Sequence, residues 1–375
     1  MGIWLLKLPF LSPIKHNLAT HTGSENLVVK VTTADGVTGY GEGIPRAFVT
    51  GESVAGSLSF LRQELVPAAL DLKVASPPDL PGALEEMRRR LAATPFPAAF
   101  CALETALLDA AGKTWNLPVS EFLGPQVNVK LIYSAVIPMA AEEKLAHFCH
   151  LVRMNRMQFV KLKVGSPDDL RILAQAREAL GPEIDLRVDA NAAWFPIEAI
   201  ARIRQMQEFR ISAVEQPVAK EDFAGLKAVQ DAVEVPIIAD ESLCTVGDAQ
   251  RLIDLQACQI FNLRLSKCGG LLAANRIRQL AAAAGVRCQL GCHVGETSIL
   301  AAAGRHFTLA SPALAYLEGS FAPYLLARDP VARSVTFGPG GLAGALPGPG
   351  LGIEVLEEVL NDLSASPARG LEAAG

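Results

Sequence analysis

The stretch Phe159-Val160-Lys161-Leu162-Lys163-Val164-Gly165 indicates the fold class of this chain. Side chains of a strand alternate between its two faces, so Lys161 and Lys163 share one face and the apolar residues share the other. Residues 167–180 follow with the apolar periodicity of an amphipathic helix. A strand followed by a helix that covers its apolar face is one βα unit.

The same strand-then-helix order recurs between residues 126 and 335. The sequence predicts strands at 129–137, 159–164, 185–189, 212–215, 236–240, 260–266, 287–291 and 313–317. It predicts helices at 167–180, 196–206, 222–232, 246–257, 270–284 and 298–310. Parallel strands need crossover connections, and eight βα units in a row close into a barrel. We therefore predict an α/β fold, a (β/α)8-type barrel (modified TIM barrel), over residues 126–335.

The segments on either side of the barrel differ from it in pattern. Residues 27–33 and 37–42 are extended in character and flank Asp35-Gly36, which is typical of a hairpin turn. Residues 57–112 are rich in Ala and Leu in a helical pattern. Residues 1–125 are therefore predicted to form an α+β capping domain, and the Gly/Pro-rich segment 336–375 is predicted to return to it.

Composition and charge exclude several classes of function. The 375-residue chain has a formal net charge of -5 and a sequence pI near 5.8, so it lacks the basic surface that nucleic-acid binding needs. No apolar run reaches the roughly 18 residues of a membrane span. The N-terminus lacks the pattern of a signal peptide. We expect a cytoplasmic protein whose partner is a small molecule.

The seven cysteines do not indicate disulfides or zinc. An odd number scattered through a chain of this size is not typical of a disulfide framework. Cys288 and Cys292 are four residues apart, but no second Cys or His pair follows at the spacing of a zinc finger. The cysteines are expected to be reduced and structural.

Polar residues recur at the carboxyl ends of the predicted strands. Intervals of 25 to 27 residues separate Lys163, Asp189, Glu215, Asp240, Lys267 and His293. One βα unit is about that long, since about 250 residues make eight units. These residues are therefore expected to occupy equivalent places on successive strands and to converge at the C-terminal mouth of the barrel, where barrel enzymes place their active sites.

Asp189, Glu215 and Asp240 supply three carboxylates from neighbouring strands. Hard divalent cations prefer oxygen ligands, and three convergent carboxylates repel one another without a cation. We predict that they bind Mg²⁺, with Mn²⁺ as the alternative ion. Capping of the following helices, or surface ion pairs, would explain any one acid alone but not three in register between lysines.

Three lysines are predicted to carry the proton chemistry. Neighbouring ammonium groups near a cation repel each other's protons, so the pKa values of Lys161 and Lys163 are expected to fall toward neutrality. Lys267 is expected to enter from the sixth strand, across the ring, so that one base serves each face of a bound carbon. A carboxylate substrate that loses its α-proton becomes an enediolate, whose charge a metal ion stabilises.

At these residues the chain resembles the enolase superfamily, specifically its muconate-lactonizing-enzyme-like subgroup in the mandelate racemase/muconate lactonizing enzyme family. The match runs through Gly39-Tyr40-Gly41-Glu42, Ala102-Leu103-Glu104-Thr105-Ala106-Leu107-Leu108-Asp109, Lys161-Leu162-Lys163, Asp189-Ala190-Asn191, Glu215-Gln216-Pro217, Ala239-Asp240-Glu241-Ser242 and Lys267-Cys268-Gly269-Gly270. It covers nearly the whole chain, and the motifs together are highly specific.

The resemblance implies roles for these residues. It implies a capping domain over the barrel mouth and Mg²⁺ held by Asp189, Glu215 and Asp240. It implies Lys163 and Lys267 as opposing acid–base groups, with Lys161 as the electrostatic helper beside the substrate carboxylate. It also implies that residues 16–25 and 46–52 cover the substrate, and that the protein forms a homo-oligomer.

Further candidates near the substrate are Asn191, Glu241, His293, Glu296, Arg46 and Glu318. Dipeptide epimerases of this subgroup usually carry an Asp-x-Asp motif after the eighth strand, where this chain has Glu318-Gly319-Ser320 with one acid. This departure weakens the interpretation as a dipeptide epimerase. His293 is interpreted either as a residue that touches substrate or as a hydrogen-bonded spacer.

Three functions remain open on this pattern. The first is an isomerase, either a racemase or epimerase that transfers protons between two bases or a muconate-type cycloisomerase. The second is a lyase or dehydratase of the o-succinylbenzoate synthase kind, which would use the same intermediate. The third is a non-catalytic binding barrel, which conflicts with the retention of all six ring residues. The motifs define the first half of a reaction and leave the substrate open.

Overall fold

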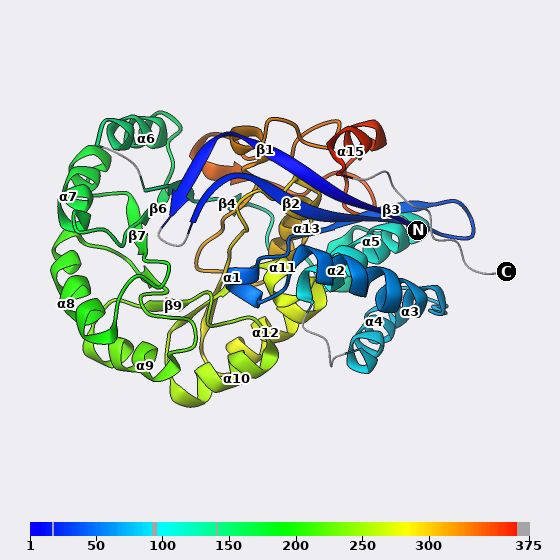
Figure 1. The fold of residues 1–375 in the computed structure, drawn as a ribbon, viewed down its shortest axis with the longest axis horizontal. Helices are drawn as coiled ribbons and strands as arrows, with labels where there is room; N and C mark the ends of the chain where they lie inside the picture. Colours follow the sequence, from blue (N-terminus) through cyan, green and yellow to red (C-terminus); the bar gives the residue numbers. More distant parts are fainter. Residues whose placement is uncertain (17–18, 92–95, 140–141, 366–375) are drawn as a thin grey trace.

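The computed structural model describes residues 1–375 except 17–18, 92–95, 140–141 and 366–375. A sheet at the N-terminus, shown in blue in Figure 1, lies against a curved array of strands and helices coloured from green to orange. The sheet is antiparallel in the order β1-β2-β3. Its strands are β1 (Gly2–His16), β2 (Ala19–Thr32) and β3 (Thr38–Gly43).

Helices complete the N-terminal α+β domain. They are α1 (Ala47–Thr50), α2 (Val54–Phe60), the π-helical turn η1 (Leu61–Leu65), α3 (Val66–Leu70), α4 (Asp79–Arg90), α5 (Pro97–Trp115) and the 3-10 turn η2 (Val119–Phe122). Helix α5 packs directly on β3 because small residues face each other. A Cβ atom on Gly41 would lie 2.1 Å from the carbonyl oxygen of Ala102, so only glycine permits this approach.

Seven parallel strands form the second sheet, in the sequential order β5 to β11. They are β5 (Ala135–Ile137), β6 (Phe159–Lys163), β7 (Asp185–Asp189), β8 (Val214–Glu215), β9 (Ile237–Ala239), β10 (Ile260–Leu263) and β11 (Arg287–Leu290). The ring closes at an eighth position, because Leu317 bridges to Leu290 in parallel and accepts a 2.7 Å hydrogen bond from the backbone of Ser134. The predicted barrel is confirmed.

Helices follow the strands and cover the outside of the ring (Figure 1). They are α6 (Glu142–Met154), α7 (Asp169–Leu180), α8 (Pro196–Met206) with the 3-10 turn η3 (Gln207–Phe209), α9 (Phe223–Ala232), α10 (Val246–Leu255), α12 (Leu271–Ala283) and α13 (Ser298–Leu309). The short helix α11 (Leu265–Cys268) is instead buried and packs against α5. Local capping explains where some of the helices begin. Helix α10 starts with a capping box in which Thr245 and Asp248 satisfy each other's backbone N–H groups.

Three predicted strands differ in the structure. The segment 129–137 contains two strands, β4 (Leu131–Ile132) and β5, and only β5 belongs to the parallel ring. The segment 313–317 makes a single bridge at Leu317 and no regular strand. The segment 260–266 ends as a strand at Leu263 and turns into the short helix α11, because Gly269 and Gly270 adopt positive φ angles and allow α12 to start there.

The C-terminal segment returns along the N-terminal sheet. It contains α14 (Ala322–Leu325), the 3-10 turn η4 (Pro339–Gly341), β12 (Leu342–Ala343) and α15 (Glu357–Leu363). Strand β12 pairs antiparallel with β4. Helix α15 lies beside β1 (Figure 1), where Glu357 receives a 2.6 Å contact from Lys30 and a 2.7 Å hydrogen bond from Tyr40.

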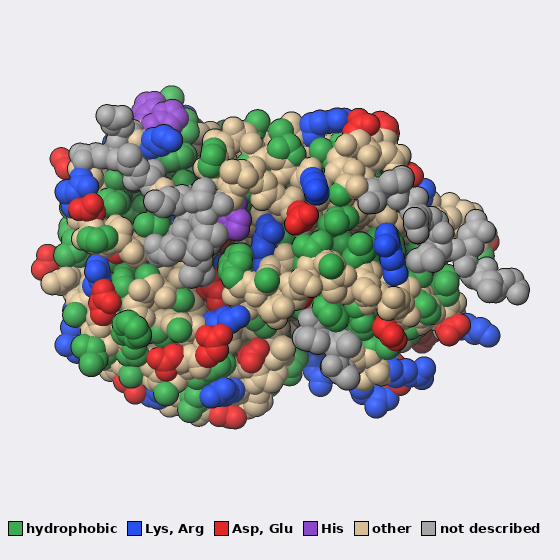
Figure 2. Space-filling model, in the orientation of Figure 1, with side chains coloured by type: hydrophobic (Ala, Val, Ile, Leu, Met, Phe, Trp, Pro, Cys, Tyr) green, Lys and Arg blue, Asp and Glu red, His purple; other side chains and the backbone are tan. Residues whose placement is uncertain are grey.

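Acidic and basic side chains are interspersed over the face of the molecule that Figure 2 shows, with a local group of basic residues at one edge. No helix among the described residues is long and apolar enough to cross a bilayer. Each of the seven cysteines is a free thiol.

Candidate active site

A cavity of about 280 Å³ lies between the N-terminal domain and the mouth of the barrel. The N-terminal domain contributes Ser12, Ile14, His21, Arg46 and Phe48 to its wall. The tip of the β1–β2 hairpin, residues 15–20, lies outside the side chains that the structure describes. The barrel and its C-terminal extension contribute the rest, namely Val136, Pro138, Phe148, Lys161, Lys163, Asn191, Glu241, Arg264, the segment 292–296, the segment 318–321, Tyr324 and Leu325.

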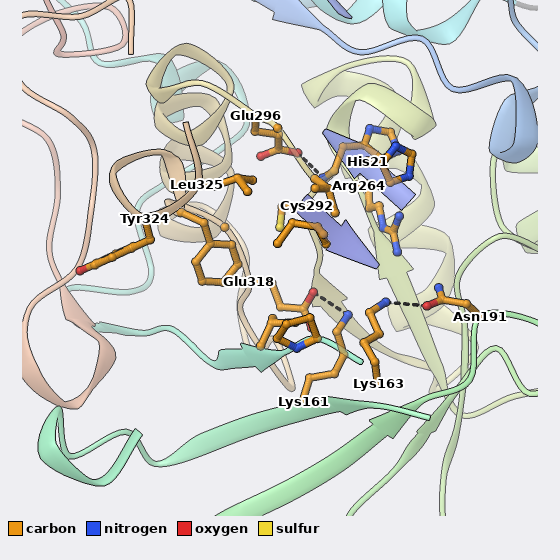
Figure 3. Close-up of a pocket in the computed structure, with 18 of the residues that line it drawn as sticks. His21, Lys161, Lys163, Asn191, Arg264, Cys292, Glu296, Glu318, Tyr324 and Leu325 are labelled. Carbon is orange, nitrogen blue, oxygen red and sulfur yellow. Dashed lines mark hydrogen bonds and ion pairs between the residues drawn. The ribbon is translucent and has the colours of Figure 1, made fainter. Parts of the chain in front are cut away.

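Lys161 and Lys163 enter the cavity side by side from β6 (Figure 3). Lys161 lies 2.8 Å from Oε2 of Glu318, 3.2 Å from Oε1 of Glu215 and 3.3 Å from Oδ2 of Asp189. Burial lowers the pKa of the Lys161 ammonium, but these carboxylates outweigh burial and hold the pKa above its usual value. The expectation that the pKa of Lys161 falls is therefore wrong, because three acids surround it.

The ammonium group of Lys163 has fewer polar contacts than that of Lys161. Its Nζ lies 2.5 Å from Oδ2 of Asp189 and 2.7 Å from Oδ1 of Asn191, and its side chain is 15% exposed. An amino group can form one more bond than these two contacts use. Lys163 therefore combines access to the cavity with an unused position on its nitrogen.

The three predicted metal ligands come from the ends of neighbouring strands. Asp189 and Glu215 pair in register on β7 and β8, and Asp240 directly follows β9. All three are fully buried. Each accepts hydrogen bonds from a different group of side chains. Asp189 accepts from Lys163. Glu215 accepts from Lys161, Asn262 and Gln289. Asp240 accepts from Arg264 and Lys267.

The donor set fits a hard cation in its chemistry, although the three acids are not drawn together. Within the described residues, no group of three or more His, Cys, Asp or Glu side chains is gathered closely enough to hold an ion. Burial, and then repulsion from Asp189, raises the pKa of Glu215 to about 8. A divalent cation bound beside Glu215 would offset this repulsion.

Lys267 does not line the cavity, contrary to its prediction as a pocket residue. It lies in α11, and its fully buried Nζ contacts the backbone oxygen of Asp240 at 2.5 Å, Oδ1 of Asp240 at 2.8 Å and the backbone oxygen of Asn262 at 2.9 Å. An ammonium group has three N–H bonds, and these acceptors use all of them. Lys267 ties the fifth strand to the sixth and has no free position toward a substrate.

Arg264 takes the place in the cavity wall that was predicted for Lys267. Its guanidinium donates to Oδ2 of Asp240 and lies 3.7 Å from Oε1 of Glu215. Burial lowers the pKa of Arg264, but Asp240 and the other acids of the ring outweigh burial and hold it well above the usual value. In Figure 3 the two lysines of β6 and Arg264 reach into the pocket from different sides.

His293, Glu296 and Arg46 form the wall next to Arg264. Neither ring nitrogen of His293 has a partner in the described structure, although the residue is only 4% exposed. Burial, and then the charges of Arg264 and Arg46, lowers the pKa of His293 well below its usual value, so the imidazole is neutral. Burial raises the pKa of Glu296 to about 8, and its Oε1 accepts a 2.7 Å hydrogen bond from the backbone of His293.

Arg46 joins the capping domain to this wall. Its Nη2 donates to Oγ of Ser24 at 2.8 Å and to the backbone oxygen of Val294 at 2.7 Å. Burial lowers the pKa of Arg46 to about 10, still far above neutrality, so the group remains a cation. The guanidinium therefore places a positive charge in the cavity wall on the side of the capping domain.

Glu318 is committed to two cations. Besides Lys161, it accepts from Arg187, a fully buried residue whose guanidinium also lies 4.2 Å from the ring centre of Tyr316. Burial raises the pKa of Glu318, but Lys161 and Arg187 outweigh burial and lower it. Glu318 thus connects the second and eighth positions of the ring.

Asn191 and Glu241 lie in the cavity wall near the metal-ligand candidates. Nδ2 of Asn191 donates to Oε1 of Glu241 at 3.2 Å, and its Oδ1 accepts from Lys163. Burial, and then the charge of Asp240, raises the pKa of Glu241 to about 7. The pair orients Lys163 from the side of the third strand.

Arg264, which lines the cavity, and Arg187, which donates to Glu318, are residues that the sequence pattern did not single out. The candidates were chosen by a spacing of about 26 residues. Lys267 follows Asp240 by 27 residues and Arg264 follows it by 24, so the spacing favoured Lys267. The alternation of Asn262 and Arg264 with Leu263 and Leu265 was the available signal, because alternate residues of a strand share a face. Arg187 shares a face of β7 with Asp185 and Asp189 and alternates in the same way with Leu186 and Val188.

Comparison with known proteins places the whole chain in one family. The model of the mandelate racemase / muconate lactonizing enzyme N-terminal domain matches residues 5–124, and that of the enolase C-terminal domain-like family matches residues 144–359. The chain therefore belongs to the mandelate racemase/muconate lactonizing enzyme family of the enolase superfamily, in its muconate-lactonizing-enzyme-like subgroup.

Its relatives in this family are isomerases. The chain is 32% identical to the L-Ala-D/L-Glu epimerase of Bacillus subtilis (strain 168) over 354 residues, 93% of this chain and 94% of the relative. It is 31% identical to muconate cycloisomerase 1 of Rhodococcus opacus over 358 residues, 94% of each chain. The crystal structure of a dipeptide epimerase from Cytophaga hutchinsonii complexed with Mg and the dipeptide D-Ala-L-Val is 28% identical, covers 97% of each chain and gives a TM-score of 0.87.

Proposed function

We propose that this protein is a Mg²⁺-dependent isomerase that removes the proton next to the carboxylate of a small substrate, with Lys163 as the base. The observation that carries the proposal is the bonding of the three lysines. Lys161 and Lys267 are enclosed by acceptors, whereas Lys163 faces the cavity with one position on its nitrogen unused.

Asp189, Glu215 and Asp240 would hold the metal. Their oxygen-only donor set is the one Mg²⁺ selects, and a similar protein is complexed with Mg. When bound, the ion supplies positive charge that stabilises the negative charge developing on the substrate carboxylate. Lys161, held as a cation by its carboxylate neighbours, would add to that stabilisation beside the carboxylate.

In the proposed step, the neutral amine of Lys163 takes the α-proton and becomes an ammonium. The bonding electrons of the C–H bond pass into the carboxylate and give an enediolate. Asn191 and Asp189 hold the lysine nitrogen in place during the transfer, as a pre-oriented base requires. Return of that proton to the same face of the same carbon only regenerates the substrate. An isomerisation therefore needs a second change, either proton delivery to the other face or bond formation between a second carboxylate and the β-carbon.

Among isomerisations, we favour cycloisomerisation of the kind that the Rhodococcus relative's name describes. In such a reaction a carboxylate oxygen of the diacid adds to the β-carbon of the other carboxylate, and the electrons of the double bond give the enediolate. The ammonium of Lys163 would then deliver a proton to the α-carbon, so that loss of the α-proton is the reverse step. That reaction needs one proton-transfer group, and the structure supplies Lys163 without a second lysine from the opposite side of the cavity wall, among the residues it describes. A dipeptide carries an ammonium group, which needs an uncommitted acid. Glu318, the acid at the end of the eighth position, is already bonded to Lys161 and Arg187.

The second candidate is racemisation, favoured by one observation. His293 lines the cavity, and both of its ring nitrogens lack partners in the described structure. An imidazole in that position could serve as an acid–base group on the side away from Lys163.

The test is exchange of substrate hydrogen in D₂O. Purified protein with Mg²⁺ is incubated with cis,cis-muconate, N-succinyl-L-lysine, L-Ala-L-Glu and N-acetyl-L-proline, and α-hydrogen loss and product mass are followed by NMR and mass spectrometry. We expect exchange or cyclisation of a substrate without loss of mass in H₂O. Lys163→Ala should lower the rate by about 10³-fold, while Lys227→Ala, on the surface of α9, should not change it. Equal rates in wild type and Lys163→Ala would refute the proposal.

A further inference from the structure

The side of the ring opposite Lys163 contains an arginine. Lys163 ends β6, the second of eight positions around the barrel, and β10 is the sixth, so these two strands face each other across the mouth. On β10 and the residues after it, Asn262 and Arg264 alternate with Leu263 and Leu265. Only Arg264 of these four lines the cavity.

Lys267 cannot replace Arg264 by a simple change of rotamer. Its ammonium has three acceptors, of which two are backbone oxygens of Asp240 and Asn262. Turning Lys267 toward the cavity would break its bonds to Oδ1 of Asp240 and to the backbone oxygen of Asn262, whereas the backbone oxygen of Asp240 would keep its hydrogen bond from the backbone of Leu243. An unpaired buried polar group costs on the order of 1–3 kcal/mol, so the observed position is strongly preferred.

Arg264 itself cannot take a proton from carbon. A guanidinium stays protonated in proteins and offers only donors. Asp240 and Glu215 lie next to the guanidinium, and their negative charges further favour its protonated form. Arg264 therefore contributes a permanent positive charge, and no base, to its side of the cavity.

The neighbours of Arg264 do not supply a strong base either. His293 has Arg264, Arg46 and Lys267 around it, and protonating it would add a further positive charge to that group. Glu296 is buried, which favours its neutral form, and it already accepts from the backbone of His293. The positive charge on this side stabilises an anion and disfavours a proton acceptor.

We propose that Lys163 alone exchanges the substrate proton and that Arg264 stabilises the anionic intermediate from the opposite side. The proton therefore leaves and returns on one face of the carbon, so the enzyme exchanges hydrogen without inverting the centre. This inference rests on the proposed function and specifies its stereochemistry. The steps balance, because Lys163 receives one proton from carbon and returns one proton to carbon.

Lysine labelling tests the geometry without a substrate. Folded protein is treated with limiting acetic anhydride, and acetylation is quantified residue by residue by mass spectrometry. We expect Lys163 to react at least about tenfold faster than Lys267, and Lys267 to react fully after denaturation. In the Arg264→Lys variant, the introduced lysine should react like Lys163. Equal reaction of Lys267 and Lys163 in the folded wild type would overturn the assignment.

Stereochemistry tests the role of Arg264 in turnover. With the compound that exchanges fastest in the D₂O experiment, wild type should incorporate deuterium while the substrate keeps its configuration. Arg264→Lys should add measurable inversion, because it places a base on the second face. Arg264→Met should lower exchange about 10²-fold without inversion. Inversion by wild type at a rate within about tenfold of exchange would contradict the proposal.

The experiments distinguish failure of the proposed function from failure of the single-face inference. If none of the four compounds exchanges, the proposed function is contradicted, and the labelling result still decides which residue faces the cavity. If exchange occurs with inversion in wild type and is lost in His293→Gln, proton abstraction stands and the single-face inference is wrong. His293→Gln is the matched variant because glutamine keeps hydrogen-bonding groups without a ring base.

Discussion

The ammonium of Lys161 lies 2.8 Å from Oε2 of Glu318, which joins the second strand of the barrel to its eighth position. Glu318 also accepts from the fully buried Arg187 on the third strand. One carboxylate thus pairs with two cations beside the eighth segment, whose backbone is hydrogen-bonded to β11 and to Ser134. The ion pairs therefore add to the closure that these backbone hydrogen bonds provide.

Glu318→Gln should therefore destabilise the fold. The change leaves Lys161 with fewer counter-charges and Arg187 buried without its acid, and breaking a buried pair in this way costs about 3–5 kcal/mol. The measurement is urea unfolding at pH 7. Asp362→Asn removes the exposed partner of Arg328 and should change stability by less than about 1 kcal/mol. A Glu318→Gln variant as stable as Asp362→Asn would show that the closure does not depend on this network.

Lys163 and Lys267 should respond differently to replacement. Lys267→Met removes three buried hydrogen bonds and should lower the free energy of unfolding by about 3–5 kcal/mol. Lys163→Met should lose proton exchange while its thermal midpoint stays within a few degrees of wild type, because its side chain is partly exposed and Asp189 keeps Lys161 nearby. Differential scanning fluorimetry and the exchange assay measure both properties. If instead Lys267→Met abolished exchange without loss of stability and Lys163→Met destabilised the fold, Lys267 would be the proton-transfer residue and Lys163 the structural one.

Magnesium should bind through the carboxylates of the ring and stabilise the protein. Isothermal titration calorimetry with Mg²⁺ alone should show one site, weakened tenfold or more by Asp189→Asn or by Asp240→Asn. Adding Mg²⁺ at about 100 times its dissociation constant should raise the free energy of unfolding by about 2.7 kcal/mol, and chelation should reverse this. Asp231→Asn on the surface of α9 is the control. Binding that is unchanged in both ring variants would place the ion elsewhere.

His306 should make folding stability depend on pH. Burial lowers its pKa to about 4 from the usual 6.5, and its Nε2 lies 3.1 Å from the backbone oxygen of Leu351. Because the folded value lies below the unfolded value, this contribution is present above pH 6.5 and is lost as pH falls toward 4. The loss approaches roughly 3 kcal/mol at its limit.

The comparison of wild type with His306→Gln isolates this contribution. Urea unfolding between about pH 7.5 and 4 should show the stability difference between the two proteins shrinking across that range as pH falls. His150→Gln changes an exposed histidine and should track wild type. Parallel pH profiles for wild type and His306→Gln would rule out the linkage.

The amino-acid sequence by itself determined the barrel and the placement of three acids at neighbouring strand ends. Each βα unit contains its own pattern of apolar residues in the strand, and three successive units have an acid at the strand's end. Asp189, Glu215 and Asp240 could therefore be assigned to neighbouring strand ends from their spacing alone. A repeated local pattern translates directly into a repeated position because parallel strands in a barrel share one direction.

Only the tertiary structure decided which of two cations, Arg264 or Lys267, lines the cavity. Arg264 and Lys267 are three residues apart, and a spacing rule cannot tell them apart when the strand ends at Leu263 and the chain turns into α11. The bonds of Lys267 to Asp240 and Asn262, and of Glu318 to Lys161 and Arg187, join residues that are 5 to 157 positions apart. Most of these contacts depend on which strands the closed ring brings together, and sequence periodicity carries no information about that pairing.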